Sequence, residues 1–277
     1  MPVQQTLRTL TEAEYDAYER DGYHIARGLF SEAEVAELRD AFMTQAQDGP
    51  VEGLSETGRI TDPNDPLYFY PRMMQPHHKP QFPLVQPIAK RRLLDQRIHD
   101  LLVDLLGEEP IAAQTMFYFK PPGSRGQDLH QDNFYLKIKP GSCMAAWLAI
   151  DDADRENGGM VVVPGSHKMD VECPRESDRA KFFTGDRVDV PEGKREVPAD
   201  LKAGDMLFFN GSVIHGSYPN NSADRFRRAF ICHYAPISCK EVGGSYPLYD
   251  FNGEPINRTA AQGAGPCGEV HDAPKAG

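Results

Sequence analysis

Residues 205–217 read DMLFFNGSVIHGS, an apolar run followed a few positions later by a histidine. The run at 206–209 is short and continuously apolar, which favours a buried β-strand. Such a strand would carry His215 from its end into the mouth of a β-barrel, where ligands commonly bind. The stretch therefore predicts both a core strand and a candidate metal ligand.

The chain beyond Pro110 has the same texture. Short apolar or alternating runs are separated there by turn residues, which is typical of a double-sheet β-sandwich or jelly roll. The expected strands lie at residues 114–120, 134–138, 144–150, 160–163, 205–209 and 228–235. We expect the jelly-roll core to occupy about residues 110–236.

Helices are expected in the first part of the chain. A Thr/Ser-x-x-Glu spacing, which satisfies free backbone donors at a helix start, occurs at residues 11–14 and again at 31–34. These signals predict two short helices within about residues 11–46, with a strand at 23–26 between them. Apolar residues at helical spacing predict a further helix over residues 88–106.

Three segments differ in composition from the expected helices and strands. Residues 50–80 are rich in Pro, Gly and Asp and are expected to form a long ordered loop or lid. Residues 171–198 are densely charged and are expected to be an insertion near the mouth of the fold. After Pro236 the chain is rich in Gly and Pro, which predicts a partly ordered tail.

Composition limits the class of protein. The 277 residues carry a formal net charge of −11, with 40% hydrophobic and 26% charged residues. These values are typical of a globular protein with a sizeable core, and we expect one domain over residues 1–277. An acidic chain lacks the Lys/Arg surface that binds a phosphate backbone, so nucleic acid is not an expected partner.

The expected location is cytoplasmic. No run reaches the ~18 apolar residues that a membrane span needs, and the first ten residues do not resemble a secretory leader. Five cysteines are scattered without CxxC spacing, which predicts reduced thiols and neither a disulfide framework nor a zinc site. The sequence carries no signal for a particular oligomeric state.

Three residues predict a metal centre. His130 and Asp132 are two positions apart, and alternation along a β-strand would place them on the same face. His215, much later in the chain, would complete a three-point site. Two imidazoles and one carboxylate on one face of an octahedron are the ligand set of non-haem Fe(II) oxygenases, in which the remaining positions stay open.

Several ordered motifs extend this pattern over most of the chain. They are YERDGY at 18–23, FKPPG at 119–123, LHQD at 129–132, AW at 146–147, NGGMVVVPGSHK at 157–168, and residues 204–234. In these motifs the chain resembles the phytanoyl-CoA dioxygenase family of Fe(II)- and 2-oxoglutarate-dependent oxygenases. The resemblance implies a mainly β protein with flanking α-helices, a double-stranded β-helix (jelly roll) whose mouth holds iron. It also implies His130, Asp132 and His215 as the iron ligands.

The resemblance further implies a site for the cosubstrate 2-oxoglutarate. Its distal carboxylate needs a cation, and an arginine offers a planar bidentate donor. Arg227 matches the family's arginine, while Lys120 and Trp147 match family positions near the cosubstrate. Strand alternation turns Arg228 away from the face of Arg227 but leaves Arg225 on that face, so only the family motif separates Arg225 from Arg227.

The leading functional hypothesis is an oxygenase that uses Fe(II), 2-oxoglutarate and dioxygen to hydroxylate a small metabolite or natural-product intermediate. One alternative is a cupin-type metal-dependent isomerase or dioxygenase, which predicts no role for Arg227. Another is a non-catalytic ligand-binding protein of the same fold. The histidine pair at 77–78 is interpreted as a solvated loop, and His24, His99, His233 and His271 receive no functional role.

Overall fold

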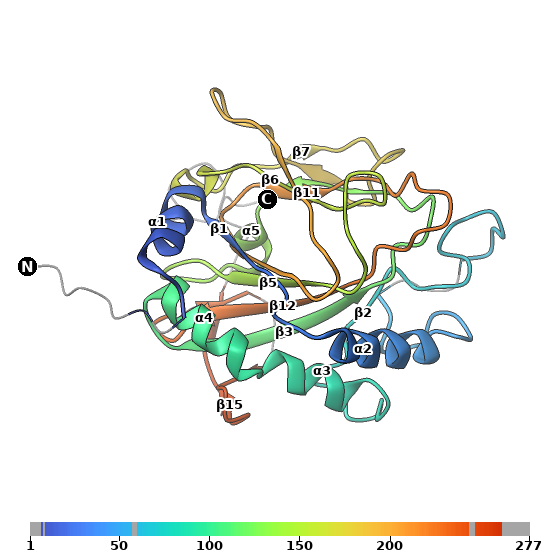
Figure 1. The fold of residues 1–277 in the computed structure, drawn as a ribbon, viewed down its shortest axis with the longest axis horizontal. Helices are drawn as coiled ribbons and strands as arrows, with labels where there is room; N and C mark the ends of the chain where they lie inside the picture. Colours follow the sequence, from blue (N-terminus) through green and yellow to red (C-terminus); the bar gives the residue numbers. More distant parts are fainter. Residues whose placement is uncertain (1–6, 8, 57–59, 244–246, 262–277) are drawn as a thin grey trace, which may run out of the picture.

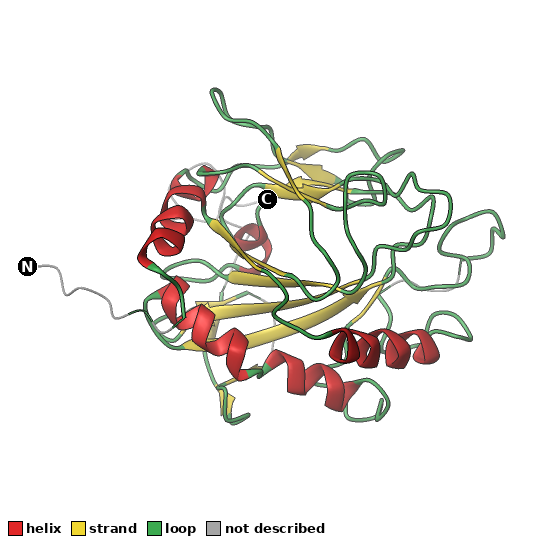
Figure 2. Cartoon of the chain, viewed as in Figure 1, coloured by secondary structure: helices red, strands yellow, loops and turns green. Residues whose placement is uncertain are grey.

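Two β-sheets face each other in the computed structural model, which describes residues 7, 9–56, 60–243 and 247–261 (Figures 1 and 2). Among the described residues the larger sheet has the strand order β1-β10-β5-β12-β3-β14-β15, with β2 also paired to β3. The smaller sheet has the order β4-β11-β6-β9. Two facing antiparallel sheets of this kind form a jelly roll.

The strands of the larger sheet are β1 (Tyr23–Ala26), β2 (Met73–Met74), β3 (Pro110–Tyr118), β5 (Met144–Ala149), β10 (Met206–Asn210), β12 (Ala229–Pro236), β14 (Leu248–Tyr249) and β15 (Pro255–Ile256). Those of the smaller sheet are β4 (Gln127–His130), β6 (Met160–Val162), β9 (Val197–Ala199) and β11 (His215–Ser217). Two short pairs lie outside these sheets, β7 (Arg175–Glu176) with β8 (Asp186–Arg187), and β13 (Glu241–Val242) with β16 (Thr259–Ala260).

The helices are α1 (Glu12–Asp21), α2 (Glu32–Gln45), α3 (Gln86–Leu93), α4 (Gln96–Leu106), the short α5 (Asp132–Leu136) and a 3-10 turn, η1 (Ser166–Lys168). Both expected capping boxes are present, because Thr11 and Ser31 each exchange hydrogen bonds with the glutamate three residues later. The two N-terminal helices and the strand between them are therefore confirmed.

Alternation along the central strands separates two apolar layers. On β5, Trp147 packs between the sheets with Leu207 and Ile231, whereas Leu148 packs on the outer face of the larger sheet. The outer layer is covered by α2, α3 and α4 (Figure 1). Phe42 of α2 stacks there on Phe117 of β3, with ring centroids 4.2 Å apart. The inner layer surrounds the space where ligands would bind.

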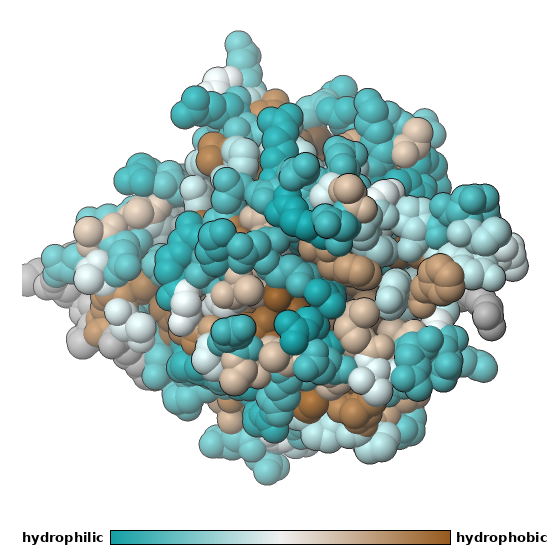
Figure 3. All heavy atoms as spheres, turned by 45° about the vertical axis from the view of Figure 1, so that its right-hand side comes forward, coloured by the Kyte–Doolittle hydropathy of each residue, from teal (hydrophilic) through white to brown (hydrophobic). Residues whose placement is uncertain are grey.

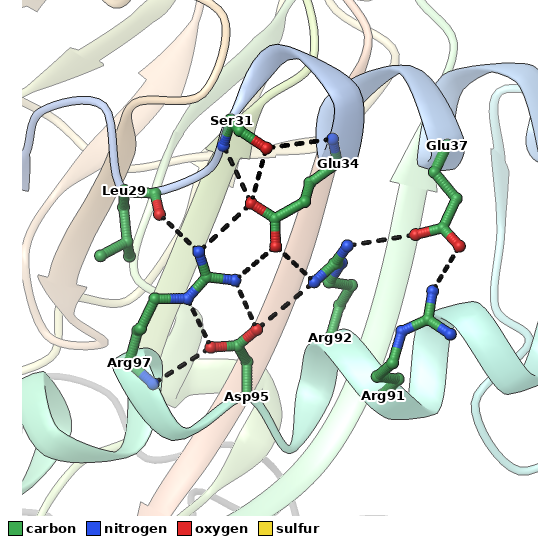
Figure 4. A network of polar contacts seen from close by, with 8 residues as sticks. All are labelled: Leu29, Ser31, Glu34, Glu37, Arg91, Arg92, Asp95 and Arg97. Atoms are coloured by element: carbon green, nitrogen blue, oxygen red, sulfur yellow. Dashed lines mark hydrogen bonds and ion pairs between the residues drawn. The ribbon is translucent and has the colours of Figure 1, made fainter.

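Ion pairs tie α2 to the α3–α4 corner (Figure 4). Arg97 bridges Glu34 at 2.7 Å and Asp95 at 2.8 Å, while Arg92 reaches Glu34 at 2.9 Å. Asp95 also caps α4 by accepting a hydrogen bond from the backbone amide of Arg97. Because a capping residue adopts an extended backbone, the chain breaks at this position. The prediction of one helix over 88–106 is therefore wrong: two helices meet at Asp95.

A second correction concerns residues 134–138. They were expected to form a strand, but residues 132–136 form α5, and Lys137 ends it with a left-handed backbone, φ 51°. A short apolar run does not distinguish a strand from a helical turn, since both can be buried. The other five expected strands overlap β3, β5, β6, β10 and β12.

The segments at 50–80 and 171–198 are both attached to the main sheets by backbone hydrogen bonds. Residues 50–80, apart from 57–59, which lie outside the described residues, contain β2 and pair with β3. Residues 171–198 carry the β7–β8 hairpin, and the backbone amide of Phe183 donates to the carbonyl of Gly126 at 2.9 Å. This bond fixes the insertion next to β4. The expected tail beyond residue 261 lies outside the described residues.

Three described cysteines are free, Cys143, Cys232 and Cys239, whereas Cys173 is disulfide-bonded. The expectation of reduced thiols is therefore wrong for Cys173, because disulfide pairing depends on proximity in space, which sequence spacing does not reveal. Within the described ranges, no helix has the length and apolar character needed to cross a membrane. The face in Figure 3 is mainly hydrophilic, with small separate hydrophobic areas.

Candidate active site

His130 and His215 meet because their strands are neighbours. His130 ends β4 and His215 begins β11, and the two residues are directly paired in the antiparallel register. Cross-strand partners lie on the same face of a sheet, so both rings point to the same side. Their ring centroids are 4.2 Å apart, and both side chains are buried. The structure thus brings together two predicted residues that are far apart in sequence.

Asp132 reaches the same point from a different element. It is the first residue of α5, so His130 and Asp132 do not share a strand as the sequence analysis assumed. The turn between β4 and α5 still directs the Asp132 carboxylate toward both rings. Its Oδ1 atom lies 3.4 Å from Nε2 of His130 and 3.6 Å from Nε2 of His215. One ligand atom from each of the three residues lies within 4.8 Å of the others.

Hydrogen bonds fix the tautomers of both rings. Nδ1 of His130 lies 2.8 Å from the Asp128 carbonyl, and Nδ1 of His215 lies 2.9 Å from the Val213 carbonyl. A carbonyl oxygen can only accept, so both Nδ1 atoms carry the proton. In the neutral rings the two Nε2 atoms therefore present lone pairs toward the cluster, which is the form that binds a metal.

The surroundings favour a neutral ring and an ionised carboxylate. Burial and the neighbouring His130 lower the pKa of His215 to about 4. Burial opposes ionisation of Asp132, but the adjacent histidines, above all His215 and His233, outweigh it and hold the pKa of Asp132 well below its usual value. At neutral pH the cluster thus offers imidazole nitrogen and carboxylate oxygen.

His233, which the sequence analysis left without a role, holds the carboxylate from the other side. Its Nε2 lies 2.9 Å from Oδ2 of Asp132, and its Nδ1 lies 3.2 Å from the side-chain nitrogen of Gln114 on the paired strand. The Gln114 amide donates to Nδ1, so Nε2 carries the proton and donates to Asp132. Strand alternation could have found this residue, because residues 227, 229, 231 and 233 have the same parity.

Gln127 makes a further contact inside the cluster. Its side-chain nitrogen lies 3.0 Å from Nε2 of His130. Since that Nε2 atom carries a lone pair, the amide donates to it. Gln127 also lines the pocket that contains the three candidate ligands. No motif in the sequence pointed to this residue, because its position depends on the irregular register between β4 and β11.

Arg227 and Lys120 are buried neighbours, and Arg227 lines the pocket that contains the three candidate ligands. Arg227 is 4% exposed and donates from Nε to the Gly158 carbonyl at 2.9 Å. Lys120 donates to the Ser217 hydroxyl at 3.0 Å and to the Tyr218 carbonyl. Burial lowers the pKa of Arg227 to about 10, and burial together with Arg227 lowers the pKa of Lys120 well below its usual value. Two buried basic groups side by side favour the binding of an anion, because buried charges need a partner.

The competing arginines are held elsewhere. Arg225 lies on the loop before β12 and pairs with Asp154 at 2.7 Å and with Glu156 at 2.6 Å. Arg228 binds Asp151, with Nη2 2.6 Å from Oδ1. No carboxylate of the described residues lies within ion-pair distance of Arg227. Of the three arginines, Arg227 alone lines the pocket beside the three candidate ligands.

The remaining predicted residue, Trp147, lies in the inner layer. Its ring is 5.3 Å from the guanidinium carbon of Arg227, a cation–π distance. Trp147 also lines the pocket together with Met160, Phe209 and Ile231. The structure therefore places five of the six expected residues on the wall of one pocket, and Lys120 contacts that pocket through Ser217.

The histidine pair at residues 77–78 does not lie in a fully solvated loop, as the sequence had suggested. His77 was expected in a solvated loop, but it is 1% exposed and accepts a hydrogen bond from the Thr115 amide at 3.2 Å. Thr115 faces away from Gln114 on β3, so His77 lies on the opposite face of the sheet from the metal cluster. Loop composition does not reveal such packing. His78 is exposed, as expected.

A jelly roll with two histidines and one carboxylate converging in its interior has the arrangement of a non-haem metal oxygenase. The chain belongs to the phytanoyl-CoA dioxygenase family. The family model described as Phytanoyl-CoA dioxygenase (PhyH) matches residues 18–229. The resemblance recognised in the sequence motifs is thereby confirmed.

Individual relatives agree with this assignment. Phytanoyl-CoA dioxygenase 1 of rice, Oryza sativa subsp. japonica, is 32% identical over 139 residues, which cover 50% of each chain. The chain spans about half the length of the curated relatives it matches.

Solved structures share the fold. EctD from S. alaskensis, solved with 2-oxoglutarate and 5-hydroxyectoine, superposes with a TM-score of 0.64 at 22% identity, covering 86% of this chain and 81% of its own. The epimerase SnoN, solved with Fe3+, alpha ketoglutarate and nogalamycin RO, gives 0.62 at 22% identity, covering 91% and 94%. The jelly-roll fold predicted from the sequence is confirmed.

Proposed function

We propose that the protein is a Fe(II)- and 2-oxoglutarate-dependent dioxygenase that hydroxylates a small metabolite or natural-product intermediate. The observation that carries this proposal is the convergence of two lone-pair imidazole nitrogens and one ionised carboxylate beside the buried Arg227, which has no carboxylate within ion-pair distance among the described residues. A metal site and a site for a carboxylate thus share one pocket. That combination suits a dicarboxylate cosubstrate that chelates the metal at one end.

The donor set fits iron. His130, Asp132 and His215 would hold the ion through Nε2, a carboxylate oxygen and Nε2. Three protein ligands would leave positions on the ion for a chelating cosubstrate and dioxygen. Iron at His130 would replace the hydrogen bond from Gln127. When bound together, iron and 2-oxoglutarate supply the activation of dioxygen and the oxidation of the substrate.

Arg227 would bind the distal carboxylate of 2-oxoglutarate. Its guanidinium is fixed by the Gly158 carbonyl and by packing over Trp147, so its remaining donors are pre-oriented. Lys120 stands beside it and holds the Ser217 hydroxyl, which also lines the pocket. An incoming carboxylate would favour the charged forms of both groups, which burial disfavours. Ser217 is an addition to the sequence-based set.

The protein's part in the chemistry is positioning and exclusion of water. His233 donates to one oxygen of Asp132 and so leaves the other oxygen for the metal. Phe209, Ile231 and Phe183 line the same pocket and keep its walls apolar. A low-dielectric site strengthens the hydrogen bonds and charges within it.

The substrate class is supported by two structural relatives. EctD was solved with 5-hydroxyectoine and SnoN with nogalamycin RO, both small molecules. A cupin-type isomerase or dioxygenase would leave the buried Arg227 without a role. A non-catalytic binding protein of this fold would bind ligand without turnover. The cytoplasmic location, the single domain over residues 1–277 and the lack of a nucleic-acid partner stay predictions from composition.

Turnover of the cosubstrate tests this proposal. Purified protein is incubated in air with Fe(II), 2-oxoglutarate and a panel of small metabolites, and succinate is quantified. We expect at least one compound to stimulate succinate formation in the wild type and none to do so in His215→Ala. Binding of Fe(II) and 2-oxoglutarate without any succinate across a broad panel would favour the non-catalytic alternative. Consumption of a compound in the absence of 2-oxoglutarate, followed by liquid chromatography, would favour the cupin-type alternative.

A further inference from the structure

A second pocket adjoins the one that contains the metal cluster. The two pockets share Tyr118, Phe183 and Arg227 as wall residues, so they meet at these side chains. We propose that the second pocket binds the substrate, and that the substrate is a small molecule with an apolar body and a carboxylate group. This inference rests on the proposed function, since it names the substrate class of the same site.

The walls suit an apolar body. Pro66 and Leu67, from the segment at 50–80, line the pocket together with Phe183, from the insertion at 171–198. Pro66 packs closely on the loop that precedes β4, because a Cβ added at Gly123 would lie 3.1 Å from its ring. Apolar walls with a few placed polar groups are typical of small-molecule sites. The two segments that lacked a predicted role thus build one pocket.

The charges of the lining are mainly positive. Arg72 and Arg125 line this pocket in addition to Lys120 and Arg227, whereas Asp65 is the one acidic residue among its lining residues. Lys120 and Arg227 are assigned above to the cosubstrate. Without these two residues, Arg72 and Arg125 still outnumber Asp65 in the lining, which favours an anionic ligand.

The two outer arginines are held in place by the protein. Arg72 stacks over the Phe183 ring at 4.4 Å and pairs with Glu56 at 2.9 Å. Arg125 donates from Nη1 to the Arg179 carbonyl at 2.9 Å. A carbonyl carries no net charge, so this contact does not neutralise the guanidinium. Arg125 is therefore the outer cation that an incoming anion would meet.

Ser124 supplies an independent indication of a ligand. It is 6% exposed and lines the pocket, and its hydroxyl has no hydrogen-bond partner among the described residues. Its backbone is fixed, because its amide donates to the Pro121 carbonyl and its carbonyl accepts from the Asn220 amide. A buried hydroxyl without a partner is unfavourable, so a ligand that accepts a hydrogen bond there would be stabilised.

A carboxylate matches these groups together. It accepts a charge-assisted hydrogen bond from a hydroxyl and pairs with a guanidinium, and both Ser124 and Arg125 belong to the loop that leads into β4. The apolar part of the molecule would then lie along Tyr118 and Phe183, toward the metal cluster. The protein would in this way orient the substrate by its acidic end.

The experiment uses 4-phenylbutyrate as the probe and 4-phenylbutanamide as its neutral match. The protein is loaded with Mn(II) and saturated with N-oxalylglycine, an unreactive analogue that occupies the cosubstrate site, and binding is measured by calorimetry. We expect the carboxylate to bind about tenfold more tightly than the amide, and Ser124→Ala or Arg125→Gln each to remove most of this preference. Arg225→Gln, a surface arginine paired elsewhere, should leave it unchanged.

The outcomes separate this inference from the proposed function. Equal binding of the two probes, or a preference that both variants retain, would overturn the carboxylate site. Weaker binding of N-oxalylglycine to Ser124→Ala would assign the pocket to the cosubstrate and also overturn it. Failure of wild-type protein to bind Mn(II) and N-oxalylglycine would contradict the proposed function alone. In that case the two probes are titrated into wild-type protein and Ser124→Ala without metal or N-oxalylglycine. A preference for the carboxylate over the amide in the wild type that Ser124→Ala loses would still support the carboxylate site, and its absence would overturn it.

Discussion

Nε2 of His233 lies 2.9 Å from Oδ2 of Asp132, on the side of the carboxylate away from His130 and His215. The two oxygens of the Asp132 carboxylate therefore have different partners. Oδ2 accepts a hydrogen bond from β12, while Oδ1 faces the two imidazoles. This arrangement fixes the orientation of a residue that begins a helix of only five residues, α5.

Removing this hydrogen bond should weaken the metal site. We expect His233→Leu to lower the affinity for Co(II) by roughly 10–100-fold, because partners that orient metal ligands have effects of that size. His233→Gln should recover part of the loss, since its amide can donate to Asp132. Competition with a chromophoric chelator measures the affinity. The control His99→Gln alters a histidine on α4 and should change nothing, and an unaltered affinity in His233→Leu would refute the role of this residue.

The assignment of Arg227 predicts a contrast with Arg225. Arg227→Ala should weaken 2-oxoglutarate binding on the order of 100-fold, because it removes a buried partner of a carboxylate. Arg225→Ala should have little effect, since Arg225 pairs with Asp154 and Glu156 on an outer loop. Calorimetry with Mn(II)-loaded protein measures both. Similar losses in the two variants would mean that the distal carboxylate is bound by neither arginine alone.

Gly158 connects a turn with the proposed cosubstrate site, because its carbonyl accepts a hydrogen bond from Arg227. Its φ is +89°, and an added Cβ would lie 2.6 Å from Lys120 Cε and 2.8 Å from the Tyr218 carbonyl oxygen. Gly193 also has a positive φ, +76°, but open space around it. Gly193→Ala should therefore cost about 1–2 kcal/mol of unfolding free energy from backbone strain alone. Gly158→Ala should cost about 1–3 kcal/mol more, from overlap.

Gly158→Ala should also weaken 2-oxoglutarate binding, because the Gly158 carbonyl holds Arg227. Urea unfolding and calorimetry on both glycine variants provide the comparison. Equal stability of the two variants would show that the turn adapts to a side chain.

The ion pairs between α2 and the α3–α4 corner predict acid sensitivity. Hydrogen bonds from Arg97 lower the pKa of Glu34, and they outweigh the effect of burial on Asp95, whose pKa is also lowered. Depressed carboxyl pKa values in the folded state mean that the unfolded state takes up protons first. The stabilisation is therefore complete above pH 4.5, the usual pKa of a glutamate, and is lost as the pH falls below it.

Arg92→Met should lower the unfolding free energy at pH 7 by about 1–3 kcal/mol, since Arg92 is a buried member of this network. The difference from wild type should shrink at pH 3, where the carboxylates of the unfolded chain are largely protonated. Urea denaturation at pH 7 and at pH 3 measures the unfolding free energy of both proteins. Arg39→Met, at an exposed pair with Asp40, should remain within about 0.5 kcal/mol of wild type. If Arg92→Met lowers the unfolding free energy equally at pH 7 and pH 3, the loss would come from packing and not from the ion pairs.

Motifs and periodicity predicted most of the fold. Short apolar runs located β3, β5, β6, β10 and β12, because buried strands leave a strong local pattern. The same pattern misassigned residues 134–138, where α5 and its left-handed end at Lys137 turn the chain after Asp132. The break at Asp95 was also missed, although an aspartate is a common helix cap.

Within the candidate site, the residues with a motif were found and those without one were missed. His130, Asp132, His215 and Arg227 stand in recognisable spacings. His233, Ser217 and Ser124 depend on contacts between distant elements, which one sequence does not display. Burial separated Arg227 from Arg225, whereas strand alternation alone had left them equivalent.

The decisive measurement is an anaerobic titration of the protein with Fe(II) and 2-oxoglutarate, followed by visible absorption. A 2-oxoglutarate chelate of ferrous iron gives a weak charge-transfer band. If His130, Asp132 and His215 hold the iron, the band appears and saturates in the wild type and is lost in His215→Ala. Wild-type protein without the band, or His215→Ala with a band of undiminished intensity, would contradict this metal site.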